Sequence, residues 1–308
     1  RLDIALITAD NKIAFRDQIP LTEEEDKVDK ITSTFFNIMK PKVGDRRIMG
    51  LCIIIPGIID AENKRILSTV IGVGYSDPVV QRFEEAFHDY PFCLLNDTAC
   101  FAYAEYVFAN ITEPNFAYIN VSKGVGACLF ANGKMLRGAG SNATQFGHFS
   151  VDRNGPLCAC GNHGCVERVV GENALTERAE ACGIDLTRFA GRKPLYCDIG
   201  AMAEDGDAHA KELIKDLAVD LSFAISNLIT LFNPSLVVIG GMGVNLGPFF
   251  LSNIRDEVQN SGFKEFVSNT WIQYSTLGLD SELGGAARYY IDHYYDFFEQ
   301  MQGGLYAD

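Results

Sequence analysis

The chain has 308 residues, with 26 Lys and Arg against 40 Asp and Glu, so its formal net charge is −14. A surface this acidic repels phosphate backbones, and these residues are not expected to grip nucleic acid themselves. A composition that is 47% hydrophobic and 21% charged excludes a disordered chain. No apolar run reaches the roughly 18 residues of a membrane span, and the opening residues do not resemble a signal peptide.

The first part of the chain alternates short apolar strands with helices. Residues 2–8 and 13–19 are predicted to pair as a hairpin. Thr22 and Glu25 have the spacing of a capping box, which predicts a helix that starts there and ends before Pro41. The apolar face expected for this helix consists of Val28, Ile31, Phe35 and Met39.

The middle of the chain continues this alternation. The Asn132-Gly133 pair is typical of a type I′ turn and predicts a hairpin around it. Residues 138–164 are rich in Gly, Asn and Cys and are too many for a structureless loop, so something other than a core should hold them. Strands are predicted at 48–55, 92–95, 116–121, 125–130 and 134–136, and a helix follows Asn96-Asp97 to about residue 108.

The last third is mainly helical. The longest helix is predicted at 208–232, with a buried apolar stripe from Leu213 to Leu231. A buried strand at 236–239 runs into Gly240-Gly241, and a final helix is predicted from 282 to about 301. Hairpins, buried strands and crossover helices together indicate an α/β protein, with two lobes expected.

Three of the nine cysteines crowd together with one histidine. His148, Cys158, Cys160 and Cys165 fall within 18 residues, and three thiolates with one imidazole complete the tetrahedral set of a structural zinc. The alternatives are a group of free cysteines, or His163 as the fourth ligand. The other six cysteines are scattered, which favours a reducing, cytoplasmic location over a disulfide scaffold.

The same residues carry a family resemblance. Gly147-His148, Gly155-Pro156 and the run from Cys158 to Glu167 closely resemble the signature of the ROK family of repressors, open reading frames and kinases. The resemblance implies an actin-like, ribonuclease-H-like α/β fold with two lobes and a zinc-binding loop. It implies sugar bound in the cleft and, in kinase members, ATP across it. The expected domains are 1–110 with the helix 285–308 packing back on it, and 111–284 containing the zinc loop 138–167.

Candidate sugar-binding residues follow two of these segments. Asp97 lies just after a predicted strand, where a carboxylate can accept a proton from a sugar hydroxyl, and by resemblance it matches the kinase base. Asn96 could donate to a hydroxyl, although both residues could instead only cap the next helix. The resemblance also places His148 and Glu167 on sugar hydroxyls. The alternative for Glu167 is a solvated charge at the start of a helix.

The glycine-rich turns that would hold phosphates depart from the kinase pattern. Ser122-Lys123-Gly124 stands where the family commonly has Gly-Thr-Gly. Gly240-Gly241 is followed by Met242 where kinases usually have a third glycine, and the first family loop would lie before Leu2. Gln145 stands where kinase members usually have Glu, and an amide can still bind a hydroxyl. Catalysis needs every phosphate contact, whereas sensing needs only the sugar pocket.

These departures favour the effector-binding part of a sugar-responsive transcriptional repressor. Such a protein would bind a small-molecule sugar and would reach DNA only through an N-terminal helix-turn-helix segment that is missing here. One alternative is a sugar kinase that uses ATP and Mg²⁺, with Asp97 as general base and residues 122–124, Gly240 and Gly241 at the nucleotide. Another is an inactive scaffold that acts by self-association. The resemblance also implies a homodimer or higher homo-oligomer.

Overall fold

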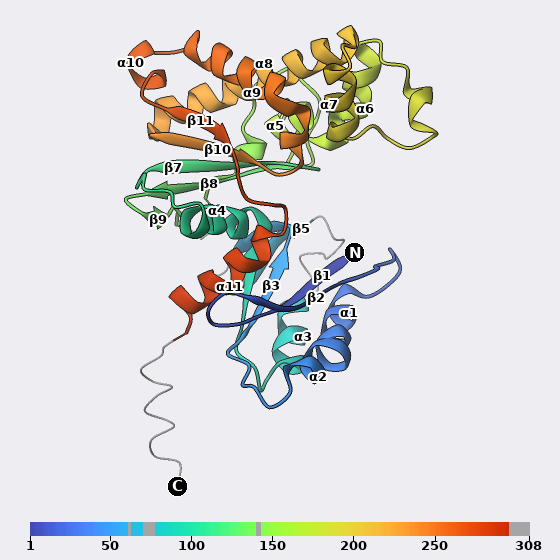
Figure 1. Ribbon diagram of the computed structural model, residues 1–308, viewed down its shortest axis with the longest axis vertical. Helices are drawn as coiled ribbons and strands as arrows, with labels where there is room; N and C mark the ends of the chain where they lie inside the picture. Colours follow the sequence, from blue (N-terminus) through green and yellow to red (C-terminus); the bar gives the residue numbers. More distant parts are fainter. Residues whose placement is uncertain (61–62, 70–77, 140–142, 296–308) are drawn as a thin grey trace. The chain divides into compact units, whose positions relative to one another are not determined.

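The chain folds into two compact units, which Figure 1 shows in a computed structural model. The structure describes residues 1–60, 63–69, 78–139 and 143–295. The first unit contains the described residues of 1–110, residue 139 and residues 280–295, and the second contains 111–138 and 143–279. Each unit has its own buried apolar cluster.

The first unit builds three small pairs of strands. β1 (Leu2–Ile7) pairs antiparallel with β2 (Ile13–Ile19), and β3 (Leu51–Ile55) pairs parallel with β6 (Phe92–Asn96). A further antiparallel pair is formed by β4 (Gly57–Asp60) and β5 (Arg65–Thr69). The helices are α1 (Lys27–Thr34), α2 (Lys40–Val43), α3 (Val79–Ala86), α4 (Asp97–Phe108) and α11 (Ser281–His293).

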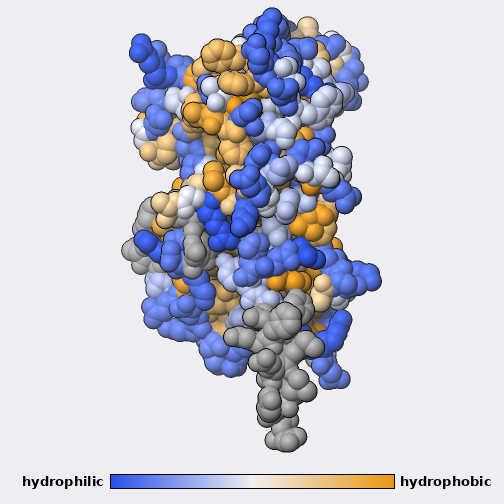
Figure 2. All heavy atoms as spheres, turned by 90° about the vertical axis from the view of Figure 1, so that its left-hand side faces the viewer, coloured by the Kyte–Doolittle hydropathy of each residue, from blue (hydrophilic) through white to orange (hydrophobic). Residues whose placement is uncertain are grey.

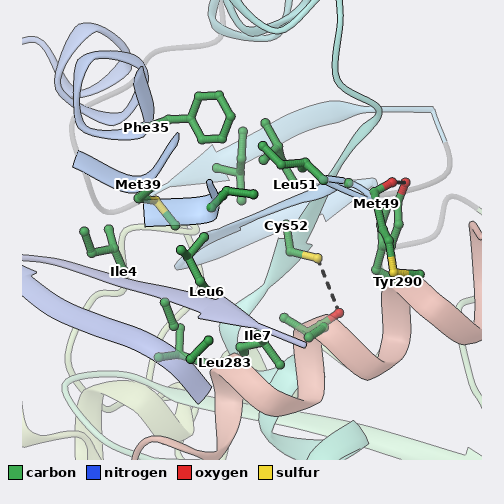
Figure 3. A pocket seen from close by; sticks show the side chains of 18 of the residues that line it. Ile4, Leu6, Ile7, Phe35, Met39, Met49, Leu51, Cys52, Leu283 and Tyr290 are labelled. Carbon is green, nitrogen blue, oxygen red and sulfur yellow. Dashed lines mark hydrogen bonds between the residues drawn. The ribbon is translucent and has the colours of Figure 1, made fainter. Parts of the chain in front are cut away.

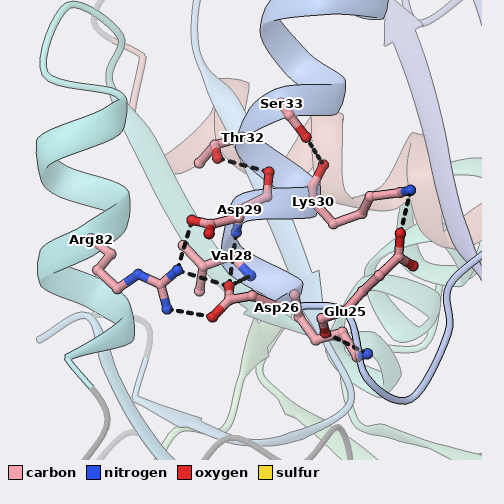
Figure 4. A network of polar contacts seen from close by, with 9 residues as sticks. Glu25, Asp26, Val28, Asp29, Lys30, Thr32, Ser33 and Arg82 are labelled. Carbon is pink, nitrogen blue, oxygen red and sulfur yellow. Dashed lines mark hydrogen bonds and ion pairs between the residues drawn. The ribbon is translucent and has the colours of Figure 1, made fainter.

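The first helix starts and ends later than the sequence predicts. Asp26, and not Thr22, is its N-cap, because the Asp26 carboxylate accepts from the N–H groups of Val28 and Asp29. Arg82 pairs with the same carboxylate, and this hydrogen-bonded pair lowers the pKa of Asp26 to about 2 (Figure 4). A π-helical turn at Phe35–Met39 follows α1, and α2 then continues the helix past Pro41. Proline is tolerated there because it lies in the first turn of α2.

The second unit is built on one five-stranded sheet in the order β11-β10-β7-β8-β9. Its hairpin turns at Asn132 and Gly133, both at positive φ, which confirms the predicted type I′ turn. The strands are β7 (Phe116–Val121), β8 (Val125–Ala131), β9 (Lys134–Met135), β10 (Leu236–Gly240) and β11 (Trp271–Tyr274).

Helices cover this sheet and supply most of the core of the second unit (Figure 1). The long helix buries its stripe from Leu213 to Leu228, but Leu231 is 83% exposed, so the predicted stripe ends one turn too late. The helices are α5 (Val166–Val170), α6 (Glu172–Ala181), α7 (Tyr196–Glu204), α8 (Ala208–Phe232), α9 (Gly247–Gln259) and α10 (Lys264–Val267). Short 3₁₀ turns are η2 (Phe146–His148), η3 (Leu186–Phe189) and η4 (Met242–Leu246).

The C-terminal helix α11 packs on α4 within the first unit. A Cβ at Gly285 would lie 2.1 Å from the carbonyl oxygen of Cys100, so only glycine allows this approach. The helix ends at His293, earlier than the predicted residue 301, and residues 296–308 lie outside the described residues.

One face of the molecule is largely polar. On the face drawn in Figure 2, apolar side chains form separate patches within a mainly hydrophilic surface. Among the described helices, none is both long enough and apolar enough to cross a lipid bilayer.

Candidate metal centre and neighbouring loops

Four side chains of the second unit converge on one point. The ligand atoms of His148, Cys158, Cys160 and Cys165 all lie within 4.8 Å of one another. Cys158 Sγ is 3.6 Å from His148 Nδ1, and the sulfurs of Cys160 and Cys165 are also 3.6 Å apart. A tetrahedral zinc with Zn–S bonds of about 2.3 Å needs sulfurs about 3.8 Å apart, so this donor set fits such an ion.

Backbone hydrogen bonds and glycines fold the loop around this cluster. Cys158 N–H donates to the carbonyl of Asn162, and Gly161 N–H donates back to Cys158. Gly164 has φ +60°, and a Cβ there would lie 1.9 Å from the backbone oxygen of Asp152. The backbone at Gly164 thus packs directly against the backbone at Asp152, and the next residue, Cys165, is fully buried.

The four residues differ in their surroundings. Burial and hydrogen bonds from neighbouring thiols raise the pKa of Cys165 to about 12. Cys160 is exposed, and a hydrogen bond from the Asn162 backbone lowers the pKa of its thiol. His163 lies outside the group, because its Nδ1 is 3.0 Å from the carbonyl oxygen of Gly155.

Glu167 faces the Ser122–Gly124 loop instead of open solvent. It lies in the first turn of α5, and its Oε2 accepts from the N–H of Val125 at 3.3 Å. A Cβ on Gly124 would lie 2.3 Å from the same oxygen. Gly124 is therefore a glycine because the Glu167 carboxylate packs against it. Gln145 lies just before η2, with an exposed side chain, and its carbonyl accepts from the N–H of His148.

The glycine-rich turn after β10 is packed against β7. A Cβ on Gly240 would lie 2.2 Å from the hydroxyl oxygen of Tyr118, and one on Gly241 would lie 2.6 Å from Ser122 Oγ. The Ser122 hydroxyl accepts from the backbone N–H of Met242 at 3.2 Å. A backbone donor of this turn is thus satisfied within the chain. The sequence shows that Ser122 departs from the glycine pattern of kinase members, but it does not predict the hydrogen bond that the Ser122 hydroxyl makes.

Asn96 and Asp97 lie in the first unit, where β6 meets α4. Asn96 is the N-cap of α4, accepting from the N–H of Ala99, and its amide donates to the carbonyl of Gly57 at 2.6 Å. Asp97 Oδ1 accepts from the N–H of Thr98 at 2.8 Å. Burial raises the pKa of the Asp97 carboxyl. Asn96 therefore caps the helix, while Asp97 presents a desolvated carboxylate at the end of a strand.

Glu282, at the start of α11, is an acidic neighbour of Asp97 that the sequence analysis did not single out. Burial, and then the charges of Asp97, Asp3 and Asp280, raise the pKa of Glu282 to about 7, while Arg16 lowers it. Asp280 is close to Glu282 in sequence, but Asp3 and Asp97 come from distant parts of the chain, so no local sequence pattern reports the whole effect.

This raised pKa makes the stability of the first unit dependent on pH. Glu282 binds a proton more tightly when folded, so its contribution is complete below pH 4.5 and lost as the pH rises through 7. We expect Glu282→Gln to stabilise the unit at pH 8 by about 2 kcal/mol, allowing for partial exposure, and to change little at pH 4. Urea unfolding at both values checks this. Glu24→Gln, at an exposed site, is the control, and equal pH profiles for both variants would refute the expectation.

Solved structures of other proteins share this fold. A structure of a ROK family transcriptional regulator, described as a homolog of the Escherichia coli Mlc protein, is 24% identical with a TM-score of 0.79, covering 92% of this chain and 74% of that one. A ROK family glucokinase from Streptomyces griseus, in complex with glucose and AMPPNP, is 23% identical with a TM-score of 0.75, covering 93% and 95%. The predicted actin-like, two-lobed α/β fold is thereby confirmed.

The family follows from the sequence match. The model of the ROK family matches residues 1–292, and the chain belongs to that family. The xylose repressor of Bacillus subtilis is 26% identical over 250 residues, which cover 81% of this chain. The matched region spans 62% of the length of that repressor.

Proposed function

We propose that this chain is the sugar-sensing part of a ROK family transcriptional regulator. The observation that carries the proposal is the hydrogen bond from the Met242 N–H to the Ser122 hydroxyl, because it occupies a backbone donor that a phosphate would need. The Glu167 carboxylate beside Gly124 also places a negative charge against the second glycine-rich turn. Both features disfavour a bound nucleotide and leave the sugar-facing residues intact.

The proposed sugar contacts come from each unit. Asn96 and Asp97 would exchange hydrogen bonds with hydroxyls in the first unit, and Gln145, His148 and Glu167 would do so in the second. His148 turns Nδ1 toward Cys158, so Nδ1 would bind the metal and Nε2 would remain for a hydroxyl. The match to a xylose repressor supports a sugar as the ligand class.

We propose that the metal is zinc and that its role is structural. The chain supplies four ligands, three sulfurs and one nitrogen, which fill a tetrahedral shell and leave no position for water. Zinc would contribute cross-linking of the 148–165 loop. The cross-linked loop would then hold the His148 ring in one orientation.

DNA contacts are proposed for a segment outside these 308 residues, because the chain itself carries a net charge of −14. We also propose that the chain self-associates, on the basis of the family resemblance.

The second candidate is a sugar kinase, and Asp97 favours it. A carboxyl whose pKa is raised by burial, at the end of β6, suits a general base toward a sugar hydroxyl. Under this candidate ATP and Mg²⁺ would bind at residues 122–124, Gly240 and Gly241.

Two measurements on the same protein separate these candidates. A panel of pentoses, hexoses and amino sugars is screened for an increase in melting temperature, and each is then tested in a coupled assay of ATP consumption. For a sensor we expect one sugar class to raise the melting temperature, with turnover below about 0.01 per second, against the roughly 1–100 per second of kinases.

Asp97→Asn is the control for this assay. Any ATP consumption that survives in this variant comes from a contaminant. Turnover in the kinase range that Asp97→Asn abolishes would overturn the sensor proposal, and a panel in which no sugar shifts the melting temperature would contradict both candidates.

A further inference from the structure

Only one of the three cysteines in the metal-ligand cluster is open to solvent. Cys158 and Cys165 are buried, whereas Cys160 is exposed. Cys160 lies near the tip of a short hairpin, which a backbone bridge between Leu157 and His163 closes. The oxidation of cysteines follows their exposure to the dissolved oxidant. A small oxidant therefore reaches the Cys160 sulfur before it reaches the other two.

A second sulfur lies close to the exposed one. The sulfurs of Cys160 and Cys165 are 3.6 Å apart, and a disulfide of about 2.05 Å needs them to approach by about 1.5 Å. The backbone of Cys165 is held by a bridge to Ser150. At Gly161, by contrast, an added Cβ would meet no atom within 4 Å. The hairpin tip that carries Cys160 is therefore the side of the pair with room to move.

Cys158 is a less suitable partner for Cys160. Its sulfur lies 3.6 Å from His148 Nδ1, so it is turned toward the imidazole. Only one residue separates it from Cys160, which leaves the backbone little freedom to reach the dihedral angle that a disulfide requires. Four residues separate Cys160 from Cys165, and two of them are glycines. The geometry thus favours one pair out of the three that the cluster offers.

The first unit holds another close pair of cysteines, but neither member is exposed. Cys52 of β3 and Cys93 of β6 are register partners; Cys93 is buried and Cys52 is partly buried. Figure 3 shows the Cys52 sulfur directed at the carbonyl oxygen of Ala286, 3.4 Å away, in the wall of a cavity. This pair provides an internal comparison, because its two thiols are neighbours without an exposed member.

We propose that Cys160 and Cys165 form a reversible disulfide when the chain meets a hydroperoxide such as hydrogen peroxide. The Cys160 sulfur attacks the O–O bond, which gives a sulfenic acid at Cys160 and one molecule of water. The Cys165 sulfur then attacks the Cys160 sulfur, so that the S–S bond forms and the hydroxyl leaves as a second water. The two thiols together lose two electrons and two protons, and the peroxide is reduced to water.

This disulfide would dismantle the metal-ligand cluster. It takes two of the four donor atoms, and the donors that remain, from His148 and Cys158, are too few for a structural zinc. Thiol reductants would restore both cysteines, as they do for redox-sensing disulfides in reducing compartments. If the chain is the proposed sugar sensor, loss of the ion would also weaken sugar binding. The disulfide itself depends on no sugar, so it can be tested separately.

Titration of the zinc-loaded chain with hydrogen peroxide tests the proposal. At about one peroxide per chain we expect the loss of about two thiols, the release of about one zinc ion to a colorimetric chelator, and a 160–165 link in non-reducing peptide maps. Dithiothreitol with added zinc reverses all three. Cys197→Ser, at an exposed site outside the cluster, is the matched control and reacts like the parent. In Cys160→Ser we expect thiol loss to be at least about tenfold slower.

Every other pattern of oxidation bears on the same point. A link that includes Cys158, or one within the pair of the first unit, would overturn the proposal, and so would zinc release without any disulfide. Thiol loss at Cys197 as fast as at Cys160 would show that exposure alone, and not the neighbouring sulfur, sets the reaction. If the chain takes up no zinc but still forms the 160–165 link, the disulfide stands and the zinc assignment falls.

Discussion

Cys160→Ser is expected to release the metal and to weaken sugar binding in the same variant. The Cys160 sulfur lies 3.6 Å from the Cys165 sulfur, and a serine hydroxyl is a poor zinc ligand beside thiolates. Without the ion, the loop would be held at this point by hydrogen bonds alone, and His148 would lose the partner that fixes its ring. We expect zinc to fall from about one per chain to near zero, and the dissociation constant for the sugar to rise at least about tenfold.

Elemental analysis and a titration with the sugar found in the melting screen measure the two quantities. Cys197→Ser is the matched control, because Cys197 is exposed and lies outside the cluster. Cys160 is itself exposed, so the substitution leaves no cavity in the core. A variant with full metal, or one with no metal and unchanged affinity, would refute the coupling between the ion and the sugar site.

The sequence predicted the helices and strands well where a local pattern decides them. The helix Ala208–Phe232 follows a long apolar stripe and ends at Asn233 in the left-handed conformation, so its bounds were predicted correctly. The helix predicted from Thr22 failed at both ends. Arg82, 56 residues away, stabilises Asp26 as the cap, and α2, which follows the π-helical turn, includes Pro41 in its first turn. A tertiary partner decided the start of that helix, and local helix geometry decided its end.

In the candidate site, too, some features follow from a local sequence pattern and others depend on contacts between distant residues. Four residues with side chains that can bind a metal lie within 18 positions of the sequence, and the structure brings their donor atoms together. The bond between Ser122 and Met242 joins residues 120 positions apart, and the shifted pKa of Glu282 depends on aspartates from three segments. No spacing rule reports such contacts. Residue types therefore predict which ligands a site can bind. Only the fold shows which hydrogen-bond donors of the site are already occupied by other groups of the chain.

Gly147→Ala is expected to be among the most damaging small substitutions in the second unit. A Cβ at this position would lie 1.8 Å from the backbone oxygen of Val125. That oxygen belongs to the backbone of the first residue of β8, which pairs with Val121 of β7, and it cannot move aside as a flexible side chain could. The 3₁₀ turn Phe146–His148 would have to shift away from the sheet and take the His148 ring with it. We expect a loss of about 3 kcal/mol in the free energy of unfolding, with zinc content lowered as well.

Gly278→Ala provides the matched control, since a Cβ there would meet no atom within 4 Å. Urea unfolding and elemental analysis of the two variants separate steric displacement of the turn from any general effect of adding a methyl group. If Gly147→Ala unfolds with the parent and retains its metal, the turn is free to move without disturbing His148. The close contact with β8 would then not be what positions the imidazole, and the orientation of His148 would have to come from the ion and the cysteine loop alone.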